Sequence, residues 1–481
     1  MCNMITRRLS LKKPSGSENA YLAGKAILLG MSLFFYGYFN FSYLPVIISS
    51  ILLNYLFNQL IIAGKSAFIR KTWLTAALLV NFGVLFYFKY YDFFLENLNI
   101  LFRTSFVLKH LLLPLGISFF TFQQVSYIID SYNNEVPKYN LLDYALFVTF
   151  FPQLIAGPIV THDEIVPQFA DADKKVFNFE NFSKGFYALA FGLFKKVIIA
   201  DTFGKAVEWG YANTDILDST NAILLVLFYT IQIYFDFSGY CDMATGIGLM
   251  FNIEITKNFS SPYKALTIID FWKRWHITLT RFFTKYVYIP LGGNRKGKVR
   301  TYINVMIVFL LSGIWHGSNW TFLLWGAMHG IFTVITRIFQ KSFDRFHPAF
   351  NWLLTFAFLN VSWVYFRADS AAQASLIIRK ILRLTFSPIL SEMAAPFRLK
   401  EIRFLFADIF GSSFLSSLAH PNTIMTLFCI FSITALLTMK NTNERIDGFR
   451  PSLGRAVLSS FLIVWSVLSF AGVSVFLYFN F

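Results

Sequence analysis

Charged side chains are scarce in this sequence. They make up only 14% of its 481 residues, whereas soluble domains carry roughly 25% charge. Hydrophobic residues reach 56%, and the 59 Phe, 23 Tyr and 10 Trp offer more aromatic surface than one soluble core can bury. This composition excludes a disordered chain, a secreted disulfide scaffold and a soluble enzyme, and it indicates a polytopic membrane protein.

Cysteine is scarce too, and familiar catalytic motifs are missing. Cys2, Cys241 and Cys429 lie far apart and form no CxxC pair, so neither a disulfide framework nor a metal site is predicted. The sequence has no HExxH, no GxSxG and no GxGxxG followed by the expected acid. No histidine has an aspartate five positions later, so the HxxxxD arrangement of soluble-type acyltransferases is absent.

Long apolar runs dominate what is present. A membrane-spanning helix needs about 20 mostly apolar residues, and about a dozen segments approach that length. The predicted fold is therefore an all-α polytopic membrane bundle of roughly 11–12 transmembrane segments. The segments lie near 20–39, 41–63, 73–90, 105–129, 141–160, 185–203, 221–240, 302–317, 320–338, 350–367, 422–439 and 456–479.

Several of these runs are interrupted by Pro or Gly. The interruptions fall in segments 114–124, 150–160 and 234–246. Non-helical backbone at membrane depth persists only where it is buried in protein or lines a wet cavity. The breaks predict re-entrant or broken helices around a central tunnel, and simple proline kinks satisfied by neighbouring helices are the alternative.

The excess of basic residues is interpreted as the positive charge that sets the orientation of a membrane protein. The 42 Lys and Arg against 26 Asp and Glu give a net charge of +16, and these cations fall between apolar runs, where they mark the cytoplasmic side. No nucleic-acid partner is predicted. Residues 1–19 are expected to form a polar cytoplasmic segment without a cleavable signal peptide, and residues 20–481 a single transmembrane domain.

Segment 263–300 concentrates basic and aromatic residues. It holds nine Lys or Arg against one acid, Asp270. From 271 to 288 the pattern predicts an interfacial amphipathic helix. Two interpretations stay open: attraction to anionic lipid, or a cytoplasmic site for a ligand with several phosphates and a ring. The GGNRKGKV stretch at 292–299 nearly matches a P-loop, but Val299 replaces the Ser or Thr that holds magnesium. Its glycines instead predict a tight surface turn.

His316 is the strongest candidate for chemistry. It follows an apolar run, and ionisable residues inside a membrane are functional candidates by default. The adjacent Gly313 and Gly317 allow a backbone or a ligand to approach. A neutral imidazole in an apolar tunnel can take a proton from a hydroxyl that attacks a carbonyl. The alternative is a hydrogen-bonded packing histidine, as for His329. The loop or interface histidines are His110, His162, His347 and His420.

At these residues the sequence resembles the membrane-bound O-acyltransferase superfamily, in its alginate O-acetylation and peptidoglycan O-acetyltransferase branch. The resemblance extends from about residue 25 to the end. Members usually begin with an extra apolar helix, where this sequence has a short polar segment. The matching stretches are LLLPLGISFFTFQQVSYIIDSY (111–132), FFPQLIAGPIV (150–160), GLFKKVIIAD (192–201), YFDFSGYCDMATGIGLM (234–250), DFWKRWHITLTRFFTKYVYIPLGGNRKGK (270–298), GIWHGSNWTFLLWGAMHG (313–330), SWVYFRADS (362–370) and FLYFNF (476–481).

The resemblance implies a multi-pass enzyme of the bacterial inner membrane. It would take an acetyl group from a cytoplasmic donor, expected to be acetyl-CoA, and pass it to an exported glycan, often through a periplasmic esterase-like acetyltransferase partner. No permanently bound cofactor is expected. The catalytic histidine of the family falls on His316, on the helices of 301–338, and its second motif histidine falls on His276.

The mechanism expected on this basis has the donor entering from the cytoplasm, with its thioester threaded towards His316. His316 activates a hydroxyl or briefly holds the acetyl group, and His276 orients the thioester. The expected donor-binding residues are Arg274, Trp275, Arg281, Lys285, Asn294, Arg295 and Lys296. The expected tunnel-lining residues are Gln153, Asp236, Ser238, Asp242, Trp315, Asn319 and Trp320. Asp236 and Asp242 have an equally simple interpretation as satisfied structural carboxylates.

Two other functions remain open on the sequence. One is D-alanyl transfer to teichoic acid, or acylation of a lipid, by an enzyme of the same superfamily. The other is a transporter or channel, which hydropathy alone favours. The absence of detectable repeat symmetry and the concentration of site-like residues in 263–330 argue against transport.

Overall fold

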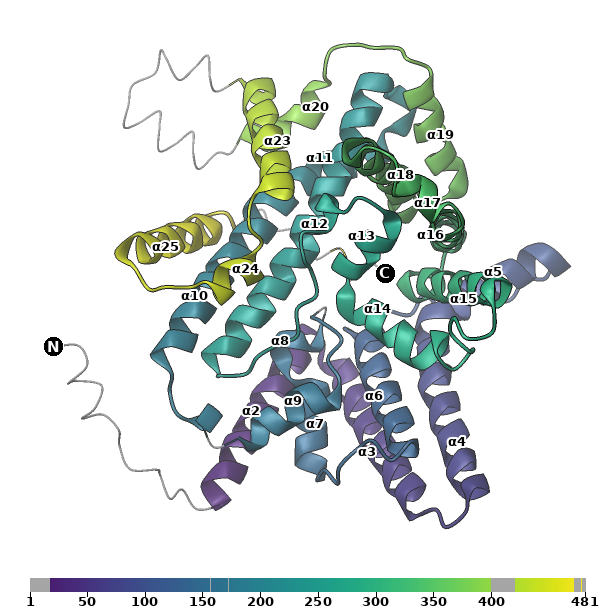
Figure 1. The fold of residues 1–481 in the computed structure, drawn as a ribbon, viewed down its shortest axis with the longest axis vertical. Coiled ribbons are helices and arrows are strands. Elements are labelled where there is room, and N and C mark those ends of the chain that lie inside the picture. Colours follow the sequence, from purple (N-terminus) through teal and green to yellow (C-terminus); the bar gives the residue numbers. More distant parts are fainter. Residues whose placement is uncertain (1–17, 156, 172, 399–419, 471–476, 478–481) are drawn as a thin grey trace.

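The chain is an all-helical membrane protein, as the sequence predicts. The computed structural model describes residues 18–155, 157–171, 173–398, 420–470 and 477. Every regular element within those ranges is a helix (Figure 1). Nearly all of the predicted polar segment 1–19 lies outside the described residues, as does FLYFNF apart from Leu477.

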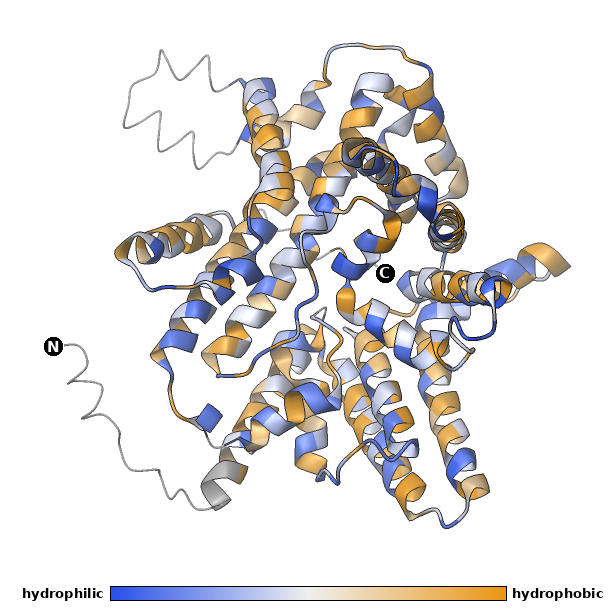
Figure 2. Cartoon of the chain, in the orientation of Figure 1, coloured by the Kyte–Doolittle hydropathy of each residue, from blue (hydrophilic) through white to orange (hydrophobic). Residues whose placement is uncertain are grey.

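Eight of the described helices are long and apolar enough to cross a membrane. Their ribbons are largely orange in Figure 2, which marks hydrophobic residues. Many of the hydrophobic side chains of the outer helices are exposed, as on lipid-facing surfaces. The eight are α2 (Glu18–Phe39), α3 (Leu44–Ala63), the continuous α4–η2–α5 (Ala67–Leu85, Phe86–Tyr90 and Tyr91–Phe102), α12 (Ser219–Met250), α15 (Lys298–His316), α16 (Trp320–Ile338), α18 (Pro348–Arg367) and α23 (Pro421–Thr438).

The remaining predicted spans correspond to shorter or more polar helices. Two of them are broken by Pro and Gly, and a third carries Lys195, Lys196 and Asp201 within its helix. These helices are α6 (Ile117–Tyr132), α7 (Leu141–Thr149), α8 (Phe151–Leu154), α10 (Phe179–Leu193), η4 (Phe194–Ala200), α11 (Asp201–Ala212) and α25 (Leu453–Leu468).

Short helices connect these elements at their ends. The main short helices are α9 (His162–Ala170), α13 (Ile268–Arg274), α14 (Ile277–Phe283), η7 (Thr284–Tyr288), α17 (Gln340–Phe343), α19 (Ala371–Leu382), α20 (Ser391–Ala394) and α24 (Thr442–Asp447).

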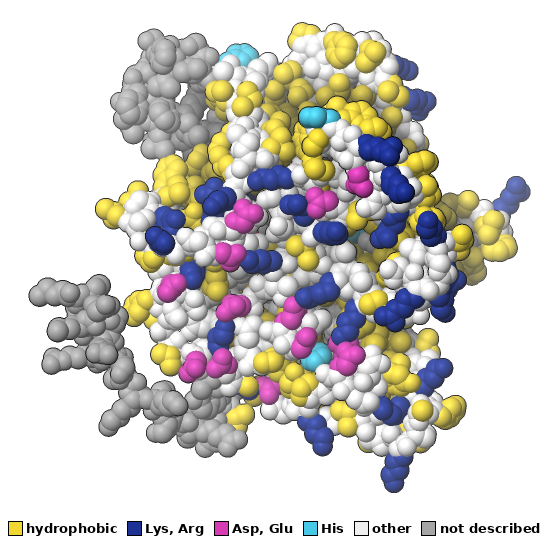
Figure 3. Space-filling model, in the orientation of Figure 1, with side chains coloured by type: hydrophobic (Ala, Val, Ile, Leu, Met, Phe, Trp, Pro, Cys, Tyr) yellow, Lys and Arg dark blue, Asp and Glu magenta, His cyan; other side chains and the backbone are white. Residues whose placement is uncertain are grey.

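Figure 3 shows a face on which Lys and Arg are interspersed with Asp and Glu across the middle, with hydrophobic side chains around the rim.

Helix α12 is the buried axis of the bundle. Its most apolar stretch is 83% buried, far more than any other spanning helix. The predicted break in 234–246 is wrong, because α12 runs without interruption through it. Its glycines serve packing instead: a Cβ on Gly246 would lie 2.7 Å from the Gly185 carbonyl oxygen, and one on Gly192 would lie 2.7 Å from that of Gly239. Two glycine pairs therefore let α10 and α12 touch backbone to backbone.

The other two predicted breaks are present and pack on each other. Gly116 has φ +67°, and a Cβ there would lie 2.6 Å from the Leu154 carbonyl oxygen. The helix of segment 141–160 ends at Leu154, and the Ile159 N–H beyond it donates to Thr278 Oγ1 at 2.9 Å. This non-helical backbone is buried in protein, as membrane depth requires.

The prediction of a single amphipathic helix over 271–288 is wrong. The segment is divided into α13, α14 and η7 by a turn at Trp275 and His276, where His276 has φ +45°. Its aromatic side chains Phe271, Trp272 and Phe282 are buried within the protein. A left-handed residue cannot continue a helix, so the segment is not one continuous helix, and its buried aromatic side chains pack into the bundle.

The glycine contacts between α10 and α12 give a direct test. Gly246→Ala and Gly192→Ala should each destabilise the protein by about 1–3 kcal/mol, because the added methyl group overpacks a backbone contact. Gly83→Ala in α4 is the matched control, since nothing lies within 4 Å of a Cβ at that position. Thermal unfolding of the purified proteins in detergent measures the difference. Equal stability of all three variants would contradict the packing role.

Candidate active site

His316 is the last residue of α15 and lies deep in the protein. Its side chain is 2% exposed. Aromatic rings surround the imidazole: the ring centroids of Trp315, Trp325 and Phe366 lie 4.9, 5.1 and 5.1 Å from its own. The helix ends here because Gly317 is fully extended, with φ −168°. The α15–α16 turn therefore presents the imidazole at a fixed point within a shell of rings.

His276 reaches the same point from a different part of the chain. Its Nδ1 lies 3.1 Å from Asn258 Oδ1, which also accepts from Thr278 Oγ1 at 3.0 Å. The Ile277 N–H donates to the Asn258 carbonyl at 3.0 Å. Asn258 thus holds both the left-handed turn and the His276 ring, and it was not among the residues predicted from the sequence.

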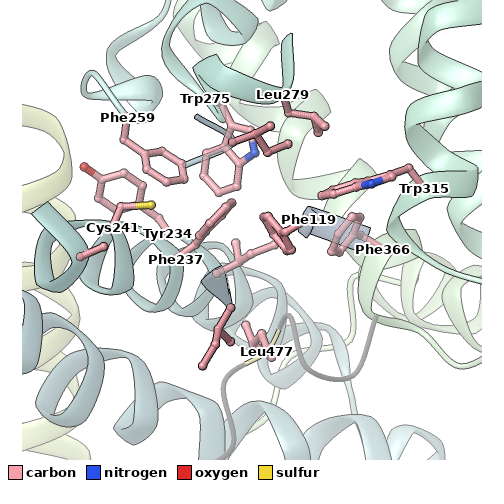
Figure 4. Close-up of a cluster of buried hydrophobic side chains, with 14 of the residues drawn as sticks. Phe119, Tyr234, Phe237, Cys241, Phe259, Trp275, Leu279, Trp315, Phe366 and Leu477 are labelled. Carbon is pink, nitrogen blue, oxygen red and sulfur yellow. The ribbon is translucent and has the colours of Figure 1, made fainter. Parts of the chain in front are cut away.

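The two predicted histidines are brought together although 40 residues separate them. Their ring centroids are 6.5 Å apart. His276 lies 4.8 Å from Phe237 and 6.0 Å from Trp315, measured between ring centroids. Figure 4 shows the surrounding apolar cluster, with Trp315, Phe119 and Phe366 on one side and Phe237, Phe259 and Trp275 on the other. Two imidazoles in so apolar a setting can handle a proton while water is kept away.

His329 supports the site without entering it. Its Nδ1 accepts from Trp272 Nε1 at 3.2 Å, and its Nε2 lies 3.1 Å from Ser362 Oγ. Its ring lies 4.6 Å from that of Trp325, which in turn packs on His316. With both nitrogens engaged, His329 is a hydrogen-bonded packing residue.

A cavity of about 660 Å³ lies at the α15–α16 turn, beside His316. Gly317, Ser318 and Asn319 form one wall, and the 366–369 segment that ends α18 forms another. Many of its walls are polar, unlike the aromatic shell around the histidines. The remaining lining residues are Tyr87, Phe88, Lys89, Asp92, His110, Leu111, Leu113, Phe322 and Leu477.

The cavity and the basic loop lie at opposite ends of α15. The loop of Asn294, Arg295 and Lys296 is exposed and precedes the first residue of α15. It is a tight turn, as predicted, with positive φ at Gly292, Gly293 and Gly297. The 19 residues of α15 span about 28 Å. The three side chains are therefore separated from the cavity by nearly the thickness of a bilayer core.

The other expected donor-binding residues occupy different settings. Arg274 bonds Asp270 at 2.9 Å and is partly exposed. Trp275 is 1% exposed and packs against Phe259 in the aromatic cluster. Trp275 therefore belongs to the buried aromatic cluster and not to an exposed basic surface.

Arg281 and Lys285 are held by acids. Arg281 forms two bonds to Glu164, at 2.5 and 2.7 Å, and Lys285 lies 2.8 Å from Asp130 and 2.9 Å from Glu135. Burial alone would raise the pKa of Glu164, but the hydrogen bonds from Arg281 outweigh it and lower that pKa below its usual range. Burial likewise opposes the charge of Lys285, while Asp130 and Glu135 raise its pKa overall. These ion pairs tie α14 and η7 to α6 and α9.

One of the histidines interpreted as a loop or interface residue is buried. His162 is 2% exposed, with Nε2 3.5 Å from Asp130 Oδ2. It belongs to the same ion-pair cluster as Lys285. Its position at the start of α9, beneath α6, explains the burial that its polar sequence neighbours conceal.

The expected tunnel residues lie in several different settings. Trp315 lies in the aromatic shell, and Asn319 lines the cavity, with Nδ2 2.9 Å from the Asp369 carbonyl. Trp320 is 54% exposed and bonds Asn97 at 2.9 Å, outside the cavity lining. Gln153 is buried in α8 and bonds the Phe147 carbonyl at 3.1 Å.

The polar residues of α12 are not among the residues that line the cavity. Asp236 pairs with Lys196 at 2.7 Å and accepts from the Leu477 N–H at 3.2 Å. Asp242 pairs with Lys195 at 2.6 Å. Ser238 is buried on the same helix. Both carboxylates are satisfied by ion pairs, which fits their structural interpretation.

Five cavity residues with a charged or imidazole side chain were not predicted. They are Lys89, Asp92, His110, Arg367 and Asp369. Of these five, only Lys89 could have been identified as a site residue from the sequence, because it is an ionisable residue at the end of a long apolar run. The others come from segment ends that only the fold brings together. Within the described ranges, no cluster of three or more His, Cys, Asp or Glu could hold a metal ion.

Comparison with known proteins places this site in a family. Residues 34–370 match the model of the membrane-bound O-acyltransferase family. The chain belongs to the membrane-bound O-acyltransferase family. It is 40% identical to the peptidoglycan O-acetyltransferase of Helicobacter pylori, over 95% of this chain and 91% of the relative. It is 39% identical to the probable alginate O-acetylase AlgI of Pseudomonas aeruginosa, over 73% and 69%.

More distant similarity reaches a different acyl group. The chain is 28% identical to the teichoic acid D-alanyltransferase of Bacillus subtilis, over 50% of this chain and 62% of that one. The protein is therefore an acyltransferase of the membrane. The transporter interpretation that hydropathy allowed is not supported by these relatives.

Substitutions of His329 and His316 should have different effects on stability and activity. His329→Gln should lower the unfolding temperature, because it removes buried hydrogen bonds, and yet leave turnover of the folded protein within about tenfold of wild type. His316→Gln should remove activity while leaving the fold intact. Acyl-transfer assays on protein matched for folded fraction measure both. Loss of activity in folded His329→Gln to the level of His316→Gln would contradict the packing role.

Proposed function

We propose that the protein transfers an acetyl group from acetyl-CoA, on the cytoplasmic side of the bacterial inner membrane, to a hydroxyl of an exported glycan. The observation that carries this proposal is the position of His316. It lies at the end of α15 that borders a polar cavity, and an exposed basic loop lies at the other end of the same helix. Such a site can take its acyl donor from one side of the membrane and its acceptor from the other.

The donor side is inferred from charge. Within the described structure Arg295 and Lys296 are exposed and form no ion pair, and they suit the phosphates of coenzyme A. Basic loops face the cytoplasm, which is where acetyl-CoA is available. Arg281 and Lys285 instead hold the surrounding helices, so the exposed turn is the better candidate for first contact with the donor.

The chemistry follows from an imidazole beside an activated ester. His316 accepts the proton of the acceptor hydroxyl as its oxygen attacks the acetyl carbonyl, the carbon–sulfur bond breaks, and the proton passes to the departing CoA thiolate. In the covalent variant the His316 nitrogen attacks the acetyl carbonyl and CoA leaves as its thiolate. The acceptor hydroxyl then attacks the acetyl group on the ring, the carbon–nitrogen bond breaks, and the hydroxyl proton passes to the CoA thiolate. His276, held by Asn258, orients the thioester carbonyl in either route.

The acceptor side is inferred from the cavity. Its walls offer carboxylates, an amide and a guanidinium, the groups that hydrogen-bond sugar hydroxyls. Either a glycan or the side chain of a periplasmic acetyltransferase partner fits this proposal. Peptidoglycan is the favoured final acceptor, because similarity to the peptidoglycan O-acetyltransferase spans nearly the whole of both chains, while similarity to the alginate O-acetylases covers about three quarters of this one.

Labelled acetyl-CoA tests the reaction. The full-length protein in lipid vesicles should release CoA, and His316→Ala should reduce that release at least about 100-fold, because its base is gone. His420→Ala is the matched control, since His420 is exposed and its side chain caps no helix. Label retained on wild type would support the covalent variant, and label found only on glycan or partner would support general base catalysis. A well-folded wild type that releases no CoA, even with a periplasmic partner, would overturn the proposal.

The donor loop has its own test. Replacing Arg295 and Lys296 together by Gln should raise KM for acetyl-CoA about three- to tenfold without lowering kcat, because exposed charges contribute to binding and lie far from the reacting carbon. Lys65→Gln, another exposed basic residue between two spans, is the control. The effect should shrink in high salt, which screens exposed charges. An unchanged KM would place the donor phosphates elsewhere.

A further inference from the structure

The end of α15 is held by side chains of another helix. The last four carbonyls of a helix have no partner within it. In α15 the Gly313 carbonyl accepts from the Gly317 N–H at 3.4 Å. The other three are reached from η2: Tyr90 Oη donates to Ile314 at 2.8 Å, and Lys89 Nζ donates to Trp315 at 2.6 Å and to His316 at 3.3 Å. All four carbonyls therefore have donors.

The Lys89 ammonium is fully used in this arrangement. An ammonium has three protons to donate, and its third acceptor is Ser118 Oγ of α6, at 3.3 Å. Lys89 is only 8% exposed. Among the described residues no carboxylate lies within ion-pair distance of it. The negative end of the α15 dipole is what compensates its charge.

The π-helical turn explains how two consecutive residues reach one helix end. The segment Phe86–Tyr90 is wound as a π-helix between α4 and α5. A π-turn inserts an extra residue into a helix and redirects its side chains, and such turns gather at functional sites. Here it directs both Lys89 and Tyr90 towards the terminus that carries His316.

A buried lysine is a costly way to cap a helix. Serine, asparagine or a backbone amide would satisfy the same carbonyls without a charge in an apolar span. The cost is accounted for if the lysine holds His316 in place, since a group that must meet a substrate tolerates little displacement.

We propose that Lys89, assisted by Tyr90, is the positioning residue for His316. It fixes the last turn of α15 and thereby the direction of the imidazole, without itself touching the reacting atoms. The inference rests on the proposed function, in which His316 activates the acceptor hydroxyl or carries the acetyl group. Loss of the ammonium should let the last turn fray and lower the fraction of His316 in the reactive geometry.

The test compares four variants of the full-length protein in lipid vesicles, with acetyl-CoA as the probe. Lys89→Met removes the charge and keeps the length, Lys89→Arg restores a buried donor cation, and Tyr90→Phe removes one hydroxyl. Lys71→Met is the control, because Lys71 is an exposed lysine of the same continuous helix. We expect Lys89→Met to lower kcat about 100-fold with KM for acetyl-CoA within twofold, Tyr90→Phe to lower kcat about fivefold, and Lys89→Arg to recover to within tenfold of wild type.

Hydrogen exchange supplies a readout that does not need activity. Amides of residues 313–317 should exchange at least tenfold faster in Lys89→Met than in wild type or Lys71→Met, because the uncapped turn opens more often. If Lys89→Met does not fold, Tyr90→Phe and Lys89→Arg decide by the same two readouts.

The outcomes separate the two proposals. A kcat close to wild type in folded Lys89→Met, while His316→Ala is inactive, overturns the positioning of His316 and leaves the proposed function standing. A raised KM with unchanged kcat also overturns it, since Lys89 would then bind substrate. Wild-type protein that releases no CoA overturns the proposed function, and unchanged exchange at 313–317 in Lys89→Met then overturns the capping role as well.

Discussion

Every buried break in the backbone of this protein must find its hydrogen bonds within the protein, and the site is built from the places where it does so. Lys89 and Tyr90 cap the end of α15, Asn258 holds the turn at His276, and Thr278 receives the Ile159 N–H. In lipid no water is available to replace these partners. The same bonds that make the breaks tolerable bring His316 and His276 to a ring separation of 6.5 Å.

Helix α12 is held by close packing and by ion pairs. It touches α10 through paired glycines, and Asp236 and Asp242 fasten it to Lys196 and Lys195 of η4. Buried ion pairs add little stability relative to well-packed apolar side chains, yet the loss of one partner is very costly. Helices in an apolar bundle could slide along one another, and such ion pairs fix the position of α12 along η4. The carboxylates of α12 thus act on the site from a distance, through the position of Phe237 against His276.

Local patterns in the sequence predicted the parts of the site that depend on local chemistry. A histidine after an apolar run with glycines on both sides indicated His316, and Pro and Gly indicated the breaks at 116 and after 154. The same glycine signal was misleading in α12, because a glycine that opens a turn and a glycine that admits a neighbouring helix look alike along the chain. Asn258 and the cavity residues His110 and Asp369 could not be found, since their roles arise from contacts between distant segments.

The contrast between the aromatic shell and the polar cavity bears on how an acyltransferase avoids hydrolysing its donor. A thioester beside a general base is open to attack by any hydroxyl, including that of water. Rings of Trp315, Trp325 and Phe366 enclose the imidazole of His316, whereas the neighbouring cavity is lined by many hydrogen-bonding groups. A sugar or side-chain hydroxyl anchored in the cavity can extend into this shell, whereas a single water molecule entering it must give up its hydrogen bonds. In the proposed reaction, transfer is preferred over hydrolysis because the surroundings change from polar in the cavity to apolar around His316. No separate group is then required to exclude water.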